Sequence, residues 1–366
     1  MPTIRVDLPE RGYDVVVGTG SLQRFDRYLH RLADQGRLFV VFDARVYALH
    51  GRRLMDHWGS FHPVELTIPV SEKRKTLREV EAIIGFLLEH EVNRKDAVLA
   101  VGGGVLSDMV GFAAASVLRG VRWGIVSTTL LGMVDAAIGG KTGVNHLRGK
   151  NLIGAFWQPR AVLCDLDFLS TLSERELVAG LGEIIKYAGL MGGETFATLA
   201  RLLDMGDLLS GRRLTRLVAE AVQFKADIVA SDEREGGLRM ILNYGHTFGH
   251  AIEAVTGYRR LRHGEAVMLG MLAANEMGCL LMPAWRAGLE PHSALIRQIL
   301  PMVPKTRLDS RQLVDAMALD KKRDLRVGRF VLIRALGEPI IVDSPPDEVI
   351  IEACERMIAT YQALGA

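Results

Sequence analysis

The sequence predicts an N-terminal Rossmann-like α/β domain built on a parallel sheet, followed by an all-α C-terminal domain. The first half of the chain alternates strand-like and helix-like segments. Its strand-like segments are continuously apolar, as is typical of parallel strands that helices cover on both faces. From Ser173 onward the pattern changes to long amphipathic helices. We therefore expect an α/β domain over residues 1–170 and a mainly α-helical domain over residues 171–366.

The apolar segments of the first half end in polar or glycine-rich stretches. A buried strand over residues 38–42 ends at Asp43, and another over residues 97–101 runs directly into three glycines that begin at Gly102. The other elements expected here are strands over residues 13–17 and 121–126 and helices near residues 22–34 and 80–88, the second helix opened by Thr76 and Glu79 as a capping box.

The second half is expected to be helical with one interruption. Ser173 and Glu176 have the spacing of a capping box and open a helix that runs through Glu183 and Lys186. A hairpin-like piece over residues 330–333 and 340–342 then precedes a last helix near residues 347–364.

Composition excludes several classes of protein. The chain has 366 residues, 49% hydrophobic and 24% charged, which indicates a globular protein long enough for two domains. A formal net charge of +2 gives no reason to expect a nucleic-acid or membrane partner. Three widely spaced cysteines without a CxxC pair favour a reduced, cytoplasmic setting. We expect no signal peptide, since the N-terminus has acidic residues and a proline where an apolar core would be needed. We also expect no transmembrane span, since Glu265 and Glu276 interrupt the apolar run over residues 264–282.

Three histidines gather in one short stretch of the second half. His246, His250 and Glu253 recur with helical spacing and share one face, Gly257 stands where a helix C-cap is usual, and His263 begins the next helical run. Imidazoles on one helix and across a short turn can converge on a metal, most naturally zinc. The alternative is a set of surface or hydrogen-bonded core histidines, and spacing alone does not decide between them.

The glycine run after residue 101 is a candidate phosphate or dinucleotide site. Glycine lets the backbone approach a pyrophosphate, and the N–H groups of the following helix would point at it. Asp43, at the end of a strand, suits a ribose hydroxyl. The sequence GGGVLSD is not the GxGxxG pattern, however, so a tight strand-to-helix turn and a loop aspartate remain the alternatives.

Residues 135–151 combine glycines, lysines and asparagines without a clean helical or strand period. Cations and amides on a flexible backbone can grip an anionic small molecule, so we interpret this segment as a long functional loop rather than a solvated one. Glu183 and Lys186 stand one turn apart, which by itself is most often a surface ion pair.

Taken together, these motifs resemble one family. The stretches GGGVLSDMVGFAAASVLRG, STTLLGMVDAAIGGKTGVNHLRGKNLIGAFWQP, GLGEIIKYAGLM, GLRMILNYGHTFGHAIE and HGEAV occur in this order. They closely resemble the 3-dehydroquinate synthases, the founding family of the sugar phosphate cyclases, from about Asp43 to Lys322. The resemblance implies a dehydroquinate synthase-like fold, with an NAD-binding α/β domain and a helical domain that binds metal and substrate.

The resemblance also implies roles for individual residues. The metal ligands, for Zn²⁺ or Co²⁺, match Glu183, His246 and His263. The NAD⁺ contacts match Asp43, Glu72, Lys75, Gly103, Gly104, Val105, Asp108, Thr128, Thr129, Lys141, Lys150, Phe168 and Thr171. The substrate and phosphate contacts match Asp135, Lys141, Asn151, Lys186, Lys225, Arg239, Asn243, His250 and one lysine of the pair Lys321–Lys322, which we take as Lys321. Arg119 matches an arginine that the family presents to the phosphate of a neighbouring subunit, which implies a homodimer.

The reaction implied by the resemblance converts 3-deoxy-D-arabino-heptulosonate 7-phosphate (DAHP) to 3-dehydroquinate and phosphate in the shikimate pathway. It proceeds through transient oxidation by NAD⁺, phosphate β-elimination, re-reduction and intramolecular aldol closure. Three residues depart from the family pattern, Arg45, Ser71 and Ser127, and none is an implied metal ligand. The alternatives are another sugar phosphate cyclase, a metal- and NAD-dependent polyol dehydrogenase, or a non-enzymatic nucleotide-binding scaffold.

Overall fold

The computed structural model describes residues 2–34, 36–206, 211–321 and 328–364, and the chain forms two compact units. The first unit comprises Met1–Leu172 and Val218–Arg234, and the second comprises Ser173–Leu217 and Glu235–Ala366. The division of the chain is therefore not a single cut near residue 170, because the segment Val218–Arg234 groups with the first unit. Within the described part of the chain, no helix combines the length and apolarity needed to cross a membrane.

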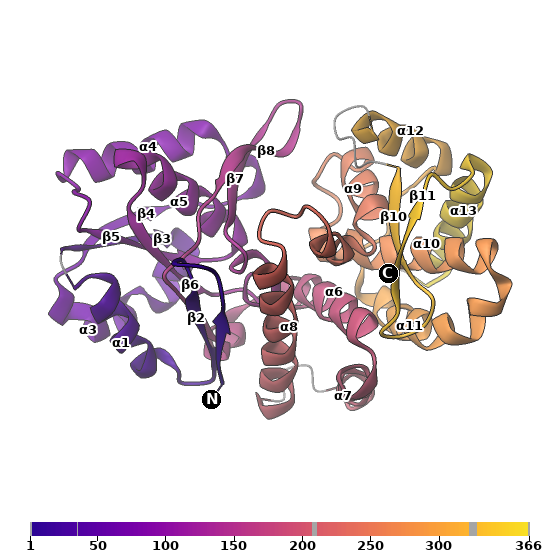
Figure 1. Ribbon diagram of the computed structural model, residues 1–366, viewed down its shortest axis with the longest axis horizontal. Helices are drawn as coiled ribbons and strands as arrows, with labels where there is room; N and C mark the ends of the chain where they lie inside the picture. The colour runs from indigo at the N-terminus through magenta and orange to yellow at the C-terminus, as the bar shows by residue number, and fades with distance from the viewer. Residues whose placement is uncertain (1, 35, 207–210, 322–327, 365–366) are drawn as a thin grey trace. The chain divides into compact units, whose positions relative to one another are not determined.

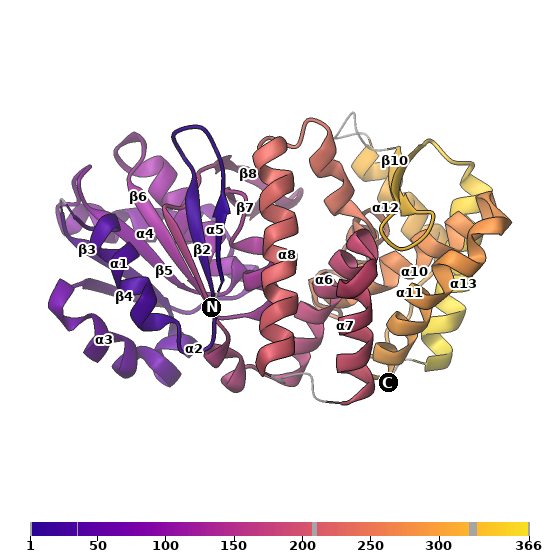
Figure 2. The same ribbon diagram turned by 60° about the horizontal axis from the view of Figure 1, so that its bottom comes forward.

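The first unit is built on a largely parallel sheet. Among the described residues, seven strands pair in the order β1-β2-β9-β6-β5-β3-β4, and only the edge strand β1 runs antiparallel to its neighbour. Figures 1 and 2 show helices α4 and α5 on one face of this sheet and α1 and α3 on the other. The strands are β1 (Thr3–Val6), β2 (Tyr13–Gly18), β3 (Leu38–Asp43), β4 (Val64–Ile68), β5 (Ala97–Gly102), β6 (Arg122–Ser127) and β9 (Ala161–Asp165). The α-helices are α1 (Leu22–Leu32), α2 (Ala44–Val46), α3 (Arg52–Trp58), α4 (Leu77–Glu89), α5 (Gly104–Ser116) and the greater part of α8 (Gly211–Ser231).

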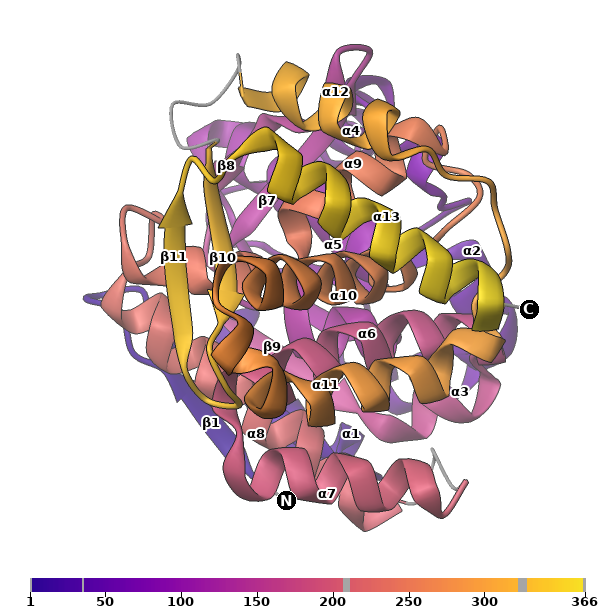
Figure 3. The ribbon, with the colours of Figure 1, turned by 90° about the vertical axis from the view of Figure 1, so that its right-hand side faces the viewer.

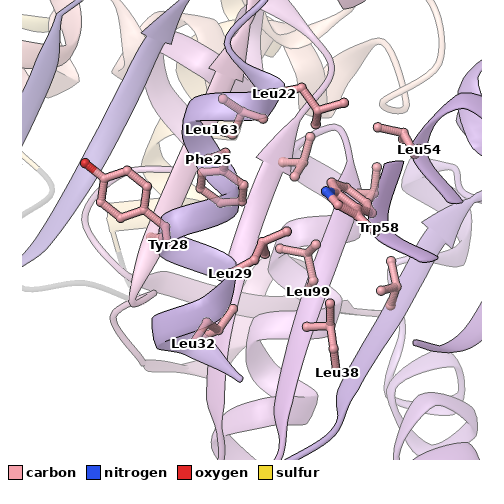
Figure 4. Packing of buried hydrophobic residues seen from close by; sticks show 14 of the residues in the cluster. Leu22, Phe25, Tyr28, Leu29, Leu32, Leu38, Leu54, Trp58, Leu99 and Leu163 are labelled. Carbon is pink, nitrogen blue, oxygen red and sulfur yellow. The ribbon is translucent and has the colours of Figure 1, made fainter. Parts of the chain in front are cut away.

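The continuous apolar runs form the middle of the sheet, as the sequence predicts. Every residue of β5 is buried, and so are the first five of β3. Figure 4 shows the cluster on one face, where Phe25 and Leu29 of α1 pack with Leu99 of β5 and Trp58 of α3. Full burial of each such side chain stabilises the fold by about 1.5–3 kcal/mol, so this face holds the sheet and its helices together.

Two expectations for the first unit are wrong in detail. Helix α4 does begin after Thr76, but the Thr76 side chain makes no cap hydrogen bond, and Glu79 pairs with Arg74 at 2.7 Å instead of closing a capping box. Residues 135–151 are not a long loop, because they lead into the antiparallel hairpin of β7 (Lys141–His146) and β8 (Gly149–Phe156).

The second unit is mainly helical, as predicted, and its described residues also form a hairpin. Its central helix, α10, is buried along most of its length and packs against α6, α9, α11 and α13, as Figure 3 shows. The helices are α6 (Glu174–Met191), α7 (Gly193–Asp204), α9 (His246–Val255), α10 (His263–Leu281), α11 (Arg286–Ile299), α12 (Ser310–Lys321) and α13 (Asp347–Leu364), and the hairpin strands are β10 (Arg329–Ile333) and β11 (Pro339–Asp343). Ser173 caps α6 through the Glu176 backbone N–H, as the capping-box pattern predicts.

Candidate functional site

Glu183 of α6, His246 of α9 and His263 of α10 converge in the second unit. Their ligand atoms all lie within 4.8 Å of one another. Oε1 of Glu183 is 3.6 Å from Nε2 of His246 and 3.6 Å from Nε2 of His263. Two ligand atoms that each lie about 2.1 Å from a tetrahedral zinc stand roughly 3.4 Å apart. The three side chains therefore have the spacing of a metal site.

The Glu183 carboxylate has the environment of a ligand. It is fully buried, and neither of its oxygens accepts a hydrogen bond from any described residue. Its Oε2 forms an ion pair with Lys186, which is only 1% exposed. The pair is thus buried and not the surface pair that its spacing most often indicates. The Lys186 ammonium compensates the carboxylate only at Oε2, so Oε1 is a buried acceptor without a donor, and a cation beside Oε1 would offset the cost of burying it.

Both histidines are oriented by hydrogen bonds at their other ring nitrogen. Nδ1 of His246 lies 3.2 Å from the backbone oxygen of Tyr244, and Nδ1 of His263 lies 3.3 Å from Oε2 of Glu253. Each acceptor fixes the proton on Nδ1, so Nε2 presents its lone pair toward Glu183. Glu253 is 2% exposed and belongs to the helical face that the sequence pattern identifies, but the pattern alone did not reveal this role.

Glycines bring the helices close enough for the ligands to meet. A Cβ on Gly264 would lie 1.7 Å from the backbone oxygen of Ala179, and one on Gly182 would lie 2.3 Å from the backbone oxygen of Gly264. Helices α6 and α10 therefore touch backbone to backbone beside Glu183 and His263. A Cβ on Gly270 would likewise lie 2.0 Å from the backbone oxygen of Gly245, which precedes His246.

The turn after α9 ends the histidine helix as predicted. Gly257 has a φ of 65°, its N–H donates to Ala254 O at 3.0 Å, and the Tyr258 N–H donates to Glu253 O at 2.8 Å. These bonds form a Schellman motif, which stops α9 just after Glu253 and turns the chain toward His263.

The other substrate residues expected in the second unit lie on several elements. His250 is exposed, and its ring centroid is 5.5 Å from that of His246 and 6.0 Å from that of His263. Arg239 is buried, and Asn243 donates to Glu235 at 3.0 Å. Lys321 is the last residue of α12, and its side chain, like the whole of Lys322, lies outside the described residues.

In the first unit, the expected nucleotide residues follow the carboxyl ends of the parallel strands. Asp43 ends β3, Gly103 follows β5 and Thr129 follows β6. The chain leaves β3 toward β4 and leaves β5 toward β6, in opposite directions along the sheet, so Asp43 and Gly103 flank a topological switch point. Crevices of this kind are where open α/β sheets bind ligands.

Glycine at this edge is required by close packing. A Cβ on Gly103 would lie 2.8 Å from Cγ2 of Thr129, and one on Gly104 would lie 2.7 Å from Cβ of Ala136. Helix α5 begins at Gly104 without a side-chain cap, which leaves its first N–H groups for an anion. Burial raises the pKa of Asp43, against the lowering effect of its hydrogen bond from the Arg45 N–H at 2.9 Å.

A buried lysine links the expected nucleotide and substrate residues of this unit. Nζ of Lys75, a residue 4% exposed, donates to Asp108 and, at 2.5 Å, to Oδ1 of Asn151. Burial raises the pKa of Asp108 to about 6, although the Lys75 ammonium opposes the rise. Asn145, which the motif comparison did not assign a role, accepts from the Asn151 N–H at 2.9 Å and donates to Glu72 at 2.7 Å. Lys150 lies 3.6 Å from the same Glu72 carboxylate.

A second buried lysine anchors the segment Val218–Arg234 to the first unit. Nζ of Lys225 lies 2.5 Å from Oδ1 and 2.7 Å from the backbone oxygen of Asp135. Glu233 is held by Gln158 and by Arg11, each at 2.9 Å. These contacts pair Lys225 with Asp135, two residues so far apart in the sequence that no motif predicts their contact.

The remaining expected residues occupy separate positions of the first unit. Lys141 begins β7 and is exposed, and Val105 lies in the first turn of α5. Thr171 contacts His50 at 2.8 Å, and Phe168 packs edge-on against the same imidazole. Arg119 is exposed in a left-handed turn, with φ values of 51°, 64° and 120° at Leu118, Arg119 and Gly120.

Comparison with known proteins gives one family over nearly the whole chain. The family model described as 3-dehydroquinate synthase N-terminal matches residues 65–179, and the one described as 3-dehydroquinate synthase C-terminal matches residues 180–323. A 3-dehydroquinate synthase of Gloeobacter violaceus is 44% identical over 96% of this chain and 98% of its own. One of Nostoc punctiforme is 40% identical over 97% of this chain and 99% of its own.

Solved structures share the fold. A 2-epi-5-epi-valiolone synthase from Streptomyces hygroscopicus subsp. jinggangensis, with NAD⁺ and Zn²⁺ bound, superposes with a TM-score of 0.82 at 28% identity, over 95% of this chain and 97% of that one. A 2-deoxy-scyllo-inosose synthase complexed with carbaglucose-6-phosphate, NAD⁺ and Co²⁺ gives a TM-score of 0.85 at 24% identity, over 97% of this chain and 99% of that one. These likenesses confirm the predicted two-part fold class.

Proposed function

The chain belongs to the 3-dehydroquinate synthase family and converts DAHP to 3-dehydroquinate and phosphate, and on that premise we propose how its residues divide the work. A divalent metal, Zn²⁺ or Co²⁺, binds to Glu183, His246 and His263. NAD⁺ binds at the carboxyl edge of the sheet in the first unit. The enzyme is a carbon–oxygen lyase that acts on a phosphate ester, so both groups assist a reaction whose net redox change is zero.

The observation that supports the metal site best is the position of Oε1 of Glu183, 3.6 Å from each of two Nε2 atoms. One carboxylate and two imidazoles leave coordination positions for substrate, as a catalytic site requires. When bound, the metal supplies Lewis acidity toward a substrate hydroxyl, and the nicotinamide supplies reversible hydride transfer. The zinc- and NAD⁺-bound relative at 28% identity supports both assignments.

The nucleotide site rests on the uncapped start of α5 and on its neighbours. The N–H groups after Gly103 would receive the pyrophosphate, and Asp43, at the end of β3, would accept from a ribose hydroxyl. The further contacts proposed for NAD⁺ are Glu72, Lys75, Gly104, Val105, Asp108, Thr128, Thr129, Lys141, Lys150, Phe168 and Thr171. Lys75 holds Asp108 and Asn151 together, so it would keep nucleotide and substrate contacts in a fixed relation.

The substrate is a dianionic phosphate that also has a carboxylate, and the chain supplies cations for both. Charge-assisted hydrogen bonds from lysine and arginine are about twice as strong as neutral ones. The residues proposed to bind the substrate are Asp135, Lys141, Asn151, Lys186, Lys225, Arg239, Asn243, His250 and Lys321. Holding one flexible substrate through several steps lowers the barrier chiefly by positioning. His250, exposed beside the two ligand imidazoles, is the residue placed to move a proton or bond the phosphate.

We propose further that the enzyme is a cytoplasmic homodimer. Arg119 would reach the phosphate bound in a neighbouring subunit, and its exposure in the left-handed turn from Leu118 to Gly120 supports this role. The three cysteines are buried and free, in keeping with a reducing compartment.

The test uses purified enzyme, DAHP, NAD⁺ and either Zn²⁺ or Co²⁺ after chelation. We expect phosphate release without NADH accumulation, restored by either metal. We also expect Glu183→Gln to lose metal and turnover together, whereas Glu174→Gln, an exposed position on the same helix, keeps both. Steady NADH production would refute the redox-neutral assignment, and full metal stoichiometry in Glu183→Gln would refute the ligand set.

A further inference from the structure

A chain of buried polar side chains lies in the second unit outside the residues that we assign to substrate, metal or nucleotide. Tyr244 and His292 are completely buried, and Asn275 and Ser293 are 2% and 6% exposed. They come from three parts of the sequence, the turn before α9, helix α10 and helix α11. Burying so many polar groups among apolar helices destabilises a fold unless each finds a partner.

The hydrogen bonds of this cluster run from donor to acceptor in a single sequence, from Tyr244 through Asn275 and His292 to the backbone of α6. The Tyr244 hydroxyl donates to Oδ1 of Asn275 at 2.5 Å. The Asn275 amide donates to Nδ1 of His292 at 3.2 Å and to the Ser293 hydroxyl at 3.0 Å. Nε2 of His292 donates to the backbone oxygen of Ile185 at 3.2 Å, since a carbonyl can only accept. The arrangement requires a neutral His292, and burial does lower the pKa of His292 to about 4.

Both ends of this hydrogen-bonded cluster contact backbone atoms next to proposed metal ligands. At one end, the backbone oxygen of Tyr244 accepts from Nδ1 of His246 at 3.2 Å. At the other end, Ile185 lies two residues after Glu183 on α6. Helix α6 admits the ring because position 189 is glycine, where a Cβ would lie 2.6 Å from Nε2 of His292.

We propose that the Tyr244–Asn275–His292 network is a positioning device for the metal centre. The network holds the hydroxyl of Tyr244, and this fixes the position of the Tyr244 backbone carbonyl, which orients His246. Through the bond from His292 to the Ile185 carbonyl, the network also holds the segment of α6 that contains Glu183. The residues touch neither substrate nor metal; they act through the ligands. The inference rests on the metal site proposed above.

Tyr244→Phe tests this idea, because it removes only the hydroxyl and keeps the buried ring. Tyr361→Phe is the matched control: Tyr361 is also completely buried in the second unit, and its hydroxyl bonds to Pro304 and Thr306, away from the ligands. Metal-free samples of wild type and both variants are titrated with Co²⁺ and followed by visible absorption. Thermal unfolding of the same samples reports their stability, and steady-state kinetics at saturating Co²⁺ give kcat and KM for DAHP.

We expect Tyr244→Phe to bind Co²⁺ about tenfold more weakly, which is the smaller end of the loss of metal affinity seen when a hydrogen-bond partner of a metal ligand is removed. Its Co²⁺ complex should also have an altered visible spectrum. KM for DAHP at saturating Co²⁺ should stay near wild type. Tyr361→Phe should lose comparable thermal stability with unchanged Co²⁺ affinity. Wild-type Co²⁺ affinity in Tyr244→Phe, or equal weakening in Tyr361→Phe, overturns the positioning role. If the wild type itself binds no Co²⁺, the metal site fails and the inference fails with it.

Because Tyr244→Phe is a mild change, Asn275→Leu provides the second variant. It removes the acceptor of the Tyr244 hydroxyl and the amide that donates to Nδ1 of His292, and leaves only the 3.3 Å contact between those two groups. Its loss of Co²⁺ affinity should therefore exceed that of Tyr244→Phe. A folded Asn275→Leu with wild-type Co²⁺ affinity contradicts the proposal.

Discussion

Nδ1 of His263 lies 3.3 Å from the buried carboxylate of Glu253, and this contact turns Nε2 of the same ring toward Glu183. We predict that Glu253→Gln weakens metal binding about tenfold, because outer partners of ligating histidines fix the ring and raise its basicity. Competition of the metal-free protein with a coloured chelator measures the affinity.

The control for Glu253 is Glu276→Gln on α10. Glu276 pairs with the half-exposed Arg356 at 3.5 Å and touches none of the three ligands. Its metal affinity should equal that of the wild type. If Glu253→Gln also retains wild-type affinity, the carboxylate does not orient His263.

The contact between α6 and α10 gives a second prediction. In Gly264→Ala the new Cβ would lie 1.7 Å from the backbone oxygen of Ala179, so the helices must separate. We expect a loss of about 3 kcal/mol in the free energy of unfolding, at the upper end for overpacking, together with loss of stoichiometric metal. Urea denaturation and elemental analysis measure the two effects.

Gly278→Ala on the same helix is the matched change for Gly264→Ala. A Cβ there meets only side chains, with Leu289 nearest at 3.3 Å. Replacing a helical glycine with alanine can add up to about 1 kcal/mol of stability, so this variant should keep its metal and unfold no earlier than wild type. Metal retained at full stoichiometry in Gly264→Ala would show that the close crossing is not needed.

How well the sequence predicts a strand depends on how many of its residues are apolar. Buried strands such as β3 and β5 are predictable because their apolar runs are continuous. The edge strands β1 and β4 are short and have only two buried residues and one buried residue, respectively, so the sequence does not predict them. The sequence predicts a loop in place of the hairpin β7–β8, because glycines interrupt its strand pattern. Gly143 and Gly154 face each other there, and a Cβ on Gly154 would lie 2.1 Å from the Thr142 oxygen.

For the site, the motifs identified the ligand candidates but not what holds them. A Glu–Lys pair one turn apart has the same spacing on a surface and in a core, and Glu183 and Lys186 are buried because α6 packs against other helices, α10 among them. The partners Glu253 and Asn145 depend on contacts across elements, which spacing along the chain does not encode. The lysine–aspartate pair Lys225–Asp135 spans 90 residues for the same reason.

Asn145 supplies the third prediction. Its Oδ1 accepts from the N–H of Asn151, which has a left-handed φ of 53°, and its amide holds Glu72. In Asn145→Ala both bonds are lost, so Asn151 should relax away from Lys75. We expect KM for DAHP to rise about tenfold, equivalent to roughly 1.4 kcal/mol, the cost of one lost polar contact.

The neighbouring position provides the comparison for Asn145→Ala. His146 is exposed on the same strand, and its ring accepts from the Arg148 N–H of the hairpin turn at 3.2 Å. His146→Ala should leave KM for DAHP unchanged. An unchanged KM in Asn145→Ala would mean that Asn151 holds its conformation without this support.

The buried imidazole of His292 gives a prediction for the pH dependence of stability. Burial lowers the pKa of His292 from 6.5 to about 4 in the folded protein, and Tyr244 is the one titratable side chain among its hydrogen-bond partners in the described part of the chain. Between these values the unfolded chain binds the proton and the folded chain does not, so stability falls as the pH decreases from 6.5 toward 4. The loss from this group should reach about 2 kcal/mol by roughly pH 5.

In His292→Gln the group no longer titrates. That variant should be less stable than wild type at neutral pH because the network is broken, and the difference in the free energy of unfolding should shrink by about 2 kcal/mol at roughly pH 5. Urea denaturation of both proteins across this range measures the difference. A constant gap between them would show that His292 is protonated to the same extent in the folded and unfolded chains, contrary to its burial.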